Sequence, residues 1–396
     1  MHNQLARIKI LTAGISSLIL MLGIARFAYT PMLPIMQEQA GLGISEGGWL
    51  AAINYIGYFG GAILASQISN MFVKDNLYRV GLAVAVFSTL IMGLTDNFWV
   101  WSVSRFFAGF SSAAGLLIGS GLIMNWLFRH EFRSELGIHF AGLGLGIAFC
   151  SLLVELTLVN FNWQEQWYLM TLIGLLLLIP AWFWLPRPEN ASMTMTGKSL
   201  ADNPPSQSFL RIFMLAYFCA GVGYVVSATF IVAIVEQMPA LEGKGQWTFL
   251  VIGLAAAPAP ILWDYVARWL GDINALILAY LLKVIALIIP VLNPGEFMIM
   301  LSAALFGATF MGIVSLVLSM SGRYYPTRPA KMMGKMTIAY GVAQIVAPAI
   351  TGVLAEYNES YMAGLYLAAG MMIAGTILMF ILRSIASKPV QKAEHS

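Results

Sequence analysis

The chain has 396 residues, of which 59% are hydrophobic and only 10% are charged. Its mean hydropathy is +0.80, whereas soluble domains carry about 25% charged residues. The composition therefore excludes a soluble enzyme, a disordered chain and a secreted disulfide scaffold. Since about 20 apolar residues cross a bilayer as a helix, the apolar stretches predict about twelve crossings.

Twelve apolar segments are long enough to be membrane-spanning helices. The first six are predicted at 10–35, 47–70, 77–95, 98–126, 135–158 and 166–185. The other six are predicted at 209–236, 247–269, 273–292, 297–321, 332–355 and 360–383. The polar stretch 187–208 is expected to be a cytoplasmic linker between a six-helix bundle over 1–186 and a second over 209–396. The predicted fold class is an all-α polytopic membrane protein.

The loop charges predict the orientation, because positive residues stay on the cytoplasmic side of a membrane. If both termini are cytoplasmic, seventeen of the 21 basic residues fall in cytoplasmic segments and only Lys244 falls in an outer loop. A missed span would move every later loop to the other side, so we expect both termini to be cytoplasmic. Three basic residues, Arg26, Arg105 and Lys283, remain inside spans.

The two groups of six spans also resemble each other. Three pairs of glycines at matching depths are separated by 197 residues: Gly115 and Gly312, Gly137 and Gly334, and Gly144 and Gly341. The offset is about half the chain, which predicts two six-helix repeats. Parallel repeats of this kind are the architecture of a large class of transporters.

Several motifs give the chain a family resemblance. The first-half motifs are Gly23-Ile-Ala-Arg26-Phe-Ala-Tyr29-Thr-Pro31-Met-Leu-Pro34, Asn54-Tyr55-Ile-Gly57-Tyr58 and Arg105-Phe-Phe-Ala-Gly109-Phe-Ser-Ser-Ala113. The second-half motifs are Gly253-Leu-Ala-Ala-Ala-Pro258 and Gly341-Val-Ala-Gln344. Along essentially its whole length the chain resembles the major facilitator superfamily, and within it the bacterial YbfB/YjiJ-like branch. The resemblance implies a multi-pass protein of the bacterial inner membrane, with spans one, four, seven and ten around a central cavity.

One segment departs from the family pattern. The motif between spans two and three normally carries an aspartate after its glycine, but here Gly61 is followed by Ala65 at that place. The equivalent place in the second half carries Asp264 and Arg268. We hypothesise that Asp264 contacts the N-terminus of span five near Arg133, where the helix dipole favours a carboxylate, and latches the outward-facing state. The alternative is an ordinary i,i+4 pair of Asp264 with Arg268.

Arg26 is the first candidate for substrate binding. It lies about 16 Å below the outer end of span one, near the bilayer midplane. A charge at this depth is costly, so an intramembrane ionisable residue is a functional candidate. The resemblance turns Arg26 toward the cavity, where a guanidinium suits a carboxylate or a phosphate. The alternative is that Arg26 binds carbonyls freed near Pro31 and holds the helix in place.

Arg105 and Glu155 are the candidates for coupling. Arg105 lies in the outer third of span four above Gly109 and Ala113, small residues that permit close helix packing. Its expected partner is Glu155, in the outer third of span five. We interpret the two as a proton-coupling pair, in which Arg105 captures or releases Glu155 as the halves rock. The alternative is a permanent structural ion pair.

Other polar side chains complete the predicted site. An apolar pocket with a few placed polar groups suits a small molecule, and the side chains expected there besides Arg26 are Tyr29, Asn54, Tyr58, Tyr224, Tyr340 and Gln344. Lys283, which the resemblance places in a peripheral span, is expected to pack against a helix end or to snorkel. His139 is expected to be a hydrogen-bonded interfacial residue.

The chemistry that is absent from the sequence narrows the function. There is no Gly-rich phosphate loop, no His-Glu-x-x-His and no Cys-x-x-Cys, so we expect no ATP hydrolysis, no metal, no cofactor and no nucleic-acid partner. An embedded enzyme is disfavoured because His139 and Glu155 lie at opposite ends of span five.

The embedded charges point to one class of solute. Three basic residues against one glutamate favour a small anionic or zwitterionic organic solute. Together with the resemblance, this predicts a secondary transporter that works by alternating access. Protons are the expected coupling ion, and a monomer is the expected state. Proton-driven efflux of neutral amphipathic compounds is the alternative. A non-transporting membrane sensor ranks lower.

Overall fold

The computed structural model describes residues 2–68, 70–130, 136–188, 203–292, 295–324 and 329–386, and the regular structure in these ranges is entirely helical. Eleven helical segments are long and apolar enough to cross a membrane, and one bent helix pair makes a twelfth. The predicted all-α membrane fold is confirmed, and the twelve predicted spans coincide with these segments.

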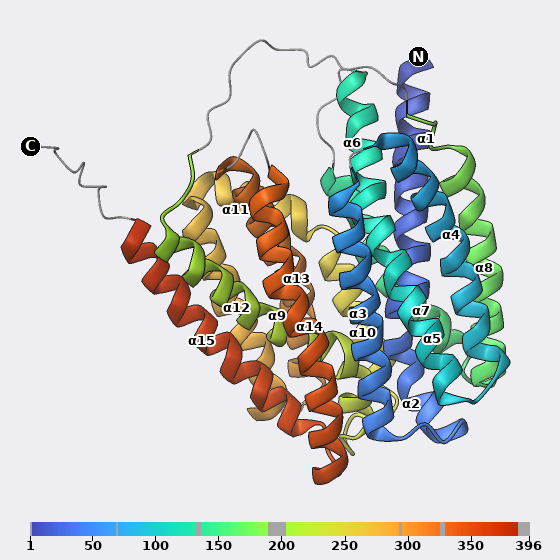
Figure 1. Cartoon of the computed structure of the whole chain (residues 1–396). Helices are drawn as coiled ribbons and strands as arrows, with labels where there is room; N and C mark the ends of the chain where they lie inside the picture. Colours follow the sequence, from blue (N-terminus) through green and yellow to red (C-terminus); the bar gives the residue numbers. More distant parts are fainter. Residues whose placement is uncertain are drawn as a thin grey trace, which may run out of the picture.

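The helices follow one another with short connections. The first half contains α1 (His2–Leu18), η1 (Ile19–Phe27), α2 (Tyr29–Gln39), α3 (Ile44–Gln67), α4 (Met71–Leu94), α5 (Phe98–Ala113), η2 (Ala114–Gly119), α6 (Ser120–Arg129), α7 (Leu136–Thr157) and α8 (Trp163–Phe183). The second half contains α9 (Gln207–Glu236), α10 (Gly245–Ala256), α11 (Ala259–Leu270), α12 (Asp272–Leu292), α13 (Glu296–Tyr324), α14 (Pro329–Asn358) and α15 (Met362–Ala386). In Figure 1 the first half, coloured blue to green, lies on the right, and most of the second half, coloured yellow-green to red, lies beside it on the left. We call the side where α1 begins and α15 ends the terminal side, and the opposite one the far side.

Side-chain caps explain where several helices begin. Asn70, Asn97 and Asn162 each accept backbone N–H groups of the helix that follows, and Ser206 does the same for α9. An Asn or Ser at this position satisfies N–H groups that have no partner within the helix. Polar residues in the short connections therefore set the register of the apolar spans.

Two spans contain a π-helical segment near their middle. In span one, α1, η1 and α2 form one continuous helix, and the N–H of Ala28 donates to the carbonyl of Gly23 at 2.8 Å. In span four, α5, η2 and α6 do the same. The hydroxyl of Ser112 donates to the carbonyl of Met21 at 2.6 Å and so joins the two spans at this depth. Since π segments are frequent at functional sites, the middle of spans one and four is where a site is expected.

Span eight is broken into α10 and α11, which are bent by 48° relative to each other. The bend falls at Pro258, the N-cap of α11. A proline lacks the N–H that a continuous helix needs, and its ring clashes with the carbonyl four residues earlier. A second proline, Pro260, follows in the first turn of α11, so the local sequence accounts for the bend.

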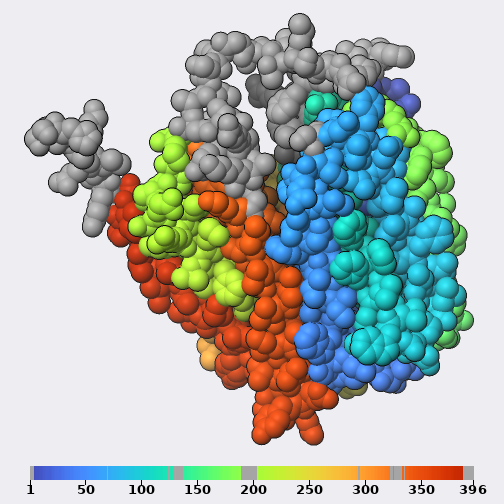
Figure 2. All heavy atoms as spheres, viewed as in Figure 1, coloured from blue at the N-terminus to red at the C-terminus, as the bar shows by residue number. Residues whose placement is uncertain are grey.

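The two halves meet mainly through three helix pairs, α3 with α14, α7 with α10, and α2 with α9, and α7 with α11 and α2 with α10 add smaller contacts. Figure 2 shows the atoms of α3 and α14 in contact along this interface. Glycines allow the approach, because a Cβ on Gly48 of α3 would lie only 2.9 Å from the Cα of Gly352 on α14. Small residues thus bring the backbones of the two halves close together.

The hydrogen bonds between the halves lie between the midplane and the far side. Among the described residues they run from Thr30 Oγ1 to Ala228 O (2.6 Å), Gln37 Nε2 to the Tyr361 hydroxyl (2.8 Å), Gln246 Nε2 to Pro31 O (2.9 Å), Trp247 Nε1 to Glu155 Oε1 (3.0 Å) and Ser151 Oγ to Gln246 O. Burial raises the pKa of Tyr361, so its hydroxyl stays neutral. The contacts on the far side therefore consist of neutral donors and backbone carbonyls, with one carboxylate.

Candidate functional site

Arg26 lies in the last turn of η1, near the middle of span one. Its side chain is 5% exposed, and the guanidinium carbon lies 4.5 Å from the ring centroids of both Tyr55 and Tyr58 on α3. Its Nε has no hydrogen-bond partner. The two tyrosines are three residues apart and so share one face of α3. Arg26 is thus a desolvated cation held between aromatic rings, with donor capacity to spare.

Arg105, on α5, binds the backbone of span one. Its two terminal nitrogens donate to Ala25 O at 3.0 Å and to Arg26 O at 3.3 Å, and its guanidinium lies over the ring of Tyr29 at 4.4 Å. Binding of backbone carbonyls was the alternative role expected for Arg26. In the structure Arg105 has this role instead. Both carbonyls belong to the π segment η1.

The expected ion pair of Arg105 with Glu155 is not formed, and this prediction is wrong. Glu155 instead accepts a hydrogen bond from Trp247 Nε1 on α10 at 3.0 Å, across the interface between the halves. The two residues have similar depth, but α5 and α7 both pack on η1 of span one rather than closely on each other. Depth alone therefore predicted a pair that the helix arrangement does not allow.

The close packing of α5 on α3 fixes the position of Arg105. A Cβ added to Gly109 would collide with the backbone of Asn54, so only glycine fits. Asn54 is fully buried and donates to the carbonyl of Arg105 at 2.8 Å, while its Oδ1 has no partner. The predicted small-residue contact below Arg105 is confirmed in the structure.

A small cavity of about 10 Å³ lies between these groups, which is about the space of one water molecule. Its walls include both arginines and come from both halves: Arg26, Phe27, Tyr29, Thr30, Ala51, Asn54, Tyr55, Arg105, Ala228 and Thr229. The hydroxyl of Tyr29 is used elsewhere, because it donates to Gly47 O at 2.9 Å. Tyr29 therefore contributes its ring, while the guanidinium groups are the cationic part of the cavity wall.

The second half presents a row of stacked aromatic rings beside this cavity. Tyr217 and Tyr340 stack at 4.5 Å between centroids, Tyr340 and Tyr224 at 5.7 Å, and Tyr224 and Phe310 at 5.2 Å. Gln344, four residues after Tyr340 on α14, is buried as well. The predicted residues Tyr224 and Tyr340 thus belong to one aromatic wall contributed by α9, α13 and α14.

Lys283 on α12 differs from its expectation. It does not snorkel: its side chain is 1% exposed, and its Nζ lies 4.6 Å from the ring of Phe306, 5.5 Å from Tyr224 and 5.8 Å from Phe310. The side chain points into the bundle of the second half because the small and aromatic residues of α9 and α13 leave room there. Sequence reasoning missed this orientation.

The gating candidates lie at the terminal side. Arg268 donates to Asp264 Oδ2 at 2.5 Å, and both side chains are more than half exposed. This is the i,i+4 pair that the sequence analysis gave as the alternative. Arg133 lies outside the described residues, so the predicted contact of Asp264 with that segment stays a prediction.

Two further groups complete the description. Tyr55, which was not among the predicted site residues, packs on Arg26 as closely as Tyr58 does; its i,i+3 spacing from Tyr58 was the available signal. His139 is fully buried and shares a hydrogen bond of 2.9 Å between its Nε2 and Ser120 Oγ. Among the described residues, no group of three or more His, Cys, Asp or Glu side chains is arranged to hold a metal ion.

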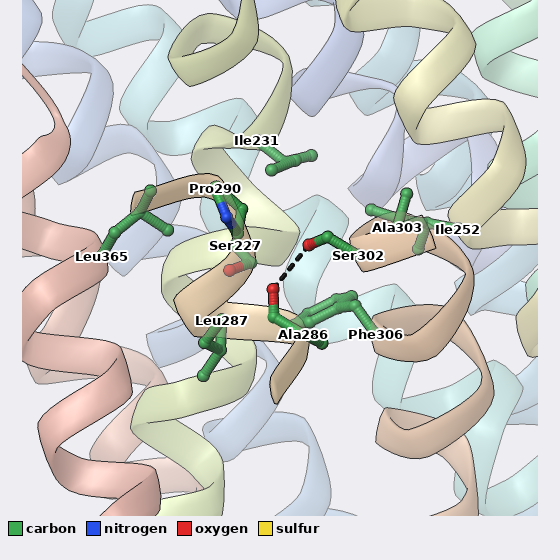
Figure 3. A pocket seen from close by; sticks show the side chains of 10 residues that line it. All are labelled: Ser227, Ile231, Ile252, Ala286, Leu287, Pro290, Ser302, Ala303, Phe306 and Leu365. Atoms are coloured by element: carbon green, nitrogen blue, oxygen red, sulfur yellow. Dashed lines mark hydrogen bonds between the residues drawn. The ribbon is translucent and has the colours of Figure 1, made fainter. Parts of the chain in front are cut away.

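A second cavity, also about 10 Å³, lies within the second half (Figure 3). Its wall is largely apolar and includes the hydroxyls of Ser227 and Ser302, the latter donating to Ala286 O at 2.5 Å. Phe306 borders both this cavity and Lys283. The cavity and the Lys283 side chain therefore have Phe306 as a common neighbour.

Several known transporters are similar to this chain in sequence. YceJ of Bacillus subtilis, an uncharacterised MFS-type transporter, is 26% identical over 221 residues, which cover 54% of this chain and 55% of YceJ, so the match spans about half of that relative. The probable sulfoacetate transporter SauU of Cupriavidus necator is 21% identical over 91% of this chain and 90% of SauU.

A crystal structure of a mutant of the nucleoside transporter NupG superposes with a TM-score of 0.74 at 12% identity, over 94% of this chain and 99% of that one. At this identity the likeness concerns the fold. The model of the family described as uncharacterised MFS-type transporter YbfB matches residues 18–380. The chain therefore belongs to this YbfB family of the major facilitator superfamily.

Proposed function

We propose that the protein is a proton-coupled secondary transporter that moves a small organic anion or zwitterion across the bacterial inner membrane by alternating access. The observation that carries the proposal is an imbalance of buried charge. Among the described residues the buried basic side chains of Lys and Arg are Arg26, Arg79, Arg105 and Lys283, and the buried carboxylate is Asp75. Arg79 pairs with Asp75 at 3.1 Å, which leaves Arg26, Arg105 and Lys283 as buried basic side chains without a carboxylate partner, and the two arginines among them carry a fixed positive charge.

An anionic solute supplies the missing charge. A buried cation without a partner costs several kcal/mol, and an anion that enters the cavity beside Arg26 would offset that cost. The guanidinium of Arg26 has an unused Nε–H, and a guanidinium matches carboxylate, phosphate and sulfonate oxygens with paired donors. The name of the relative SauU, a probable sulfoacetate transporter, supports an anion of this class.

The arrangement of the halves supports alternating access. Hydrogen bonds between the halves on the far side hold that side closed, and among the described residues no hydrogen bond joins the halves on the terminal side. At the terminal side, α7 and α11 of the two halves still pack on each other, since a Cβ on Gly137 would lie 2.8 Å from Ile261. Breaking the far-side hydrogen bonds would open the cavity beside Arg26 on that side, and separation of α7 from α11 would open it on the other.

A ligand-induced stability screen tests the proposal. Purified protein is heated with organic carboxylates, sulfonates, phosphates and neutral amphipathic compounds, and the shift of the unfolding midpoint is measured for the wild type, Arg26→Ala and the control Arg211→Ala. Arg211 is an exposed arginine on α9. We expect anions to stabilise the wild type and the control but not Arg26→Ala. Anions that stabilise all three equally would refute the placement of the site.

Efflux of neutral amphipathic compounds is the second candidate, and the aromatic row from Tyr217 to Phe310 favours it. A planar apolar solute would stack on such a wall and gain about 1 kcal/mol per aromatic contact beyond area burial. In the same screen this candidate predicts hits among neutral compounds that are lost in Tyr340→Ala and kept in Arg26→Ala. The two functions therefore give opposite patterns in one experiment.

A further inference from the structure

Lys283 is a buried amine without a counter-ion. Its Nζ is surrounded by Phe306, Tyr224 and Phe310, and among the described residues it has no hydrogen-bond or ion-pair partner. Three aromatic rings attract an ammonium, whereas taking an ammonium out of water is costly. These two effects oppose each other in setting the charge of Lys283.

The titratable groups of the neighbouring helices do not supply a counter-charge. Tyr224 of α9 faces Lys283, and α13 presents only phenylalanines to it. On α12 itself, Tyr280 donates its hydroxyl to Ala216 O at 3.0 Å.

The charged groups of the other neighbouring helices are engaged elsewhere: Asp264 with Arg268 on α11 and Glu296 of α13 with Lys244. Asp272 and Arg383 belong to the first turn of α12 and the last turn of α15, both at the terminal side. The protonation of Lys283 is thus open to control by a charge that is not part of the protein.

Tyr224 connects Lys283 to the anion site. Its ring lies 5.5 Å from Lys283 Nζ, and Ala228, four residues further along α9, lines the cavity beside Arg26. At an effective dielectric constant of about 20, opposite unit charges about 10 Å apart attract each other by roughly a tenfold factor in an equilibrium constant, so an anion beside Arg26 favours the protonated form of Lys283. By thermodynamic linkage, a protonated Lys283 then favours the bound anion by the same factor.

We propose that Lys283 is the proton-coupling residue: its neutral amine takes up one proton when an organic anion binds beside Arg26, and releases that proton when the anion leaves. The proposal rests on the anion transport proposed above and identifies the group that couples it. The nitrogen lone pair accepts a proton from water and the amine becomes an ammonium; no bond in the solute changes. The small cavity of Figure 3, which has space for about one water molecule, is lined by Phe306, and this ring also contacts Lys283.

Calorimetry measures this coupling directly. Sulfoacetate and the carboxylates and sulfonates of the screen are titrated into the protein in two buffers of different ionisation enthalpy, which gives the number of protons taken up per anion bound. The variants are Lys283→Met, which fits the apolar surroundings, and Lys283→Arg, whose side chain stays protonated. Lys244→Met is the control, because Lys244 is an exposed lysine paired with Glu296 on the far side.

For a roughly tenfold linkage we expect uptake of up to about half a proton per anion in the wild type and in Lys244→Met, and of close to zero in both Lys283 variants. Lys283→Met should also bind the anion about tenfold more weakly. Equal proton uptake in the wild type and Lys283→Met, or none in a wild type that binds an anion, would overturn the role of Lys283 and leave the anion site intact. No binding of any anion to the wild type would instead refute the proposed function.

Discussion

Replacing Arg26 with methionine separates a binding role from a structural one. Methionine keeps an unbranched apolar side chain of similar length and removes only the guanidinium. In the structure that group makes two cation–π contacts at 4.5 Å and has no carboxylate partner. If Arg26 serves an absent anion, its removal should not destabilise the unliganded protein.

The magnitude follows from two opposing terms. Two desolvated cation–π contacts contribute about 2 kcal/mol each, so their loss costs about 4 kcal/mol. The desolvation penalty of one buried ion, several kcal/mol, is relieved at the same time. We therefore expect the free energy of unfolding of Arg26→Met to equal that of the wild type or to exceed it by up to about 2 kcal/mol.

Arg105→Met is the matched comparison, because it removes the same group at the same depth. Arg105 donates to two carbonyls of span one, and leaving these unpaired costs about 1–3 kcal/mol each. The relief of desolvation is common to both variants, and Arg105 has one cation–π contact where Arg26 has two at 4.5 Å. We therefore expect Arg105→Met to be about 2 kcal/mol less stable than Arg26→Met, measured by unfolding of purified protein followed through its tryptophans. If Arg26→Met loses as much stability as Arg105→Met, Arg26 is a structural residue and the reasoning fails.

Three further predictions concern packing and gating. Gly109→Val should abolish folding, because a side chain there would collide with the backbone of Asn54. Gly60→Val should be tolerated, because a Cβ there meets nothing within 4 Å. The yield of monodisperse purified protein is measured for both variants. Gln37→Leu removes a far-side hydrogen bond between the halves. It should make a cysteine introduced at Ala228, a buried residue of the interface, react faster with a membrane-impermeant thiol reagent, whereas an unchanged rate would contradict the closed far side. Asp264→Asn breaks the exposed pair with Arg268, so stability should change by no more than about 0.5 kcal/mol; a larger loss would show that the pair is structural.

The spans were predictable from sequence, because hydropathy and loop charge act residue by residue. So was the packing at Gly109, since small residues four apart below an arginine already indicate a close helix contact. Arg26 was identified by its depth alone. These features depend on one helix at a time, or on a single neighbour.

The partners of the charges were not predictable in the same way. Arg105 and Glu155 have similar depth, but a pair also requires that their helices face each other, and rotation of helices is set by tertiary packing. The π segment η1, whose carbonyls Arg105 binds, could not be predicted from the amino-acid composition of span one. Lys283 was placed at the periphery because its span is peripheral, although its side chain points inward toward Tyr224.

The central claim is that an organic anion moves through the site at Arg26, and flux measures it most directly. The anion that stabilises the wild type most is radiolabelled, and its uptake into proteoliposomes under an imposed pH gradient is followed for the wild type and Arg26→Met. The account predicts gradient-dependent uptake by the wild type and none by Arg26→Met, although the variant is folded. Equal uptake by the two proteins would contradict it.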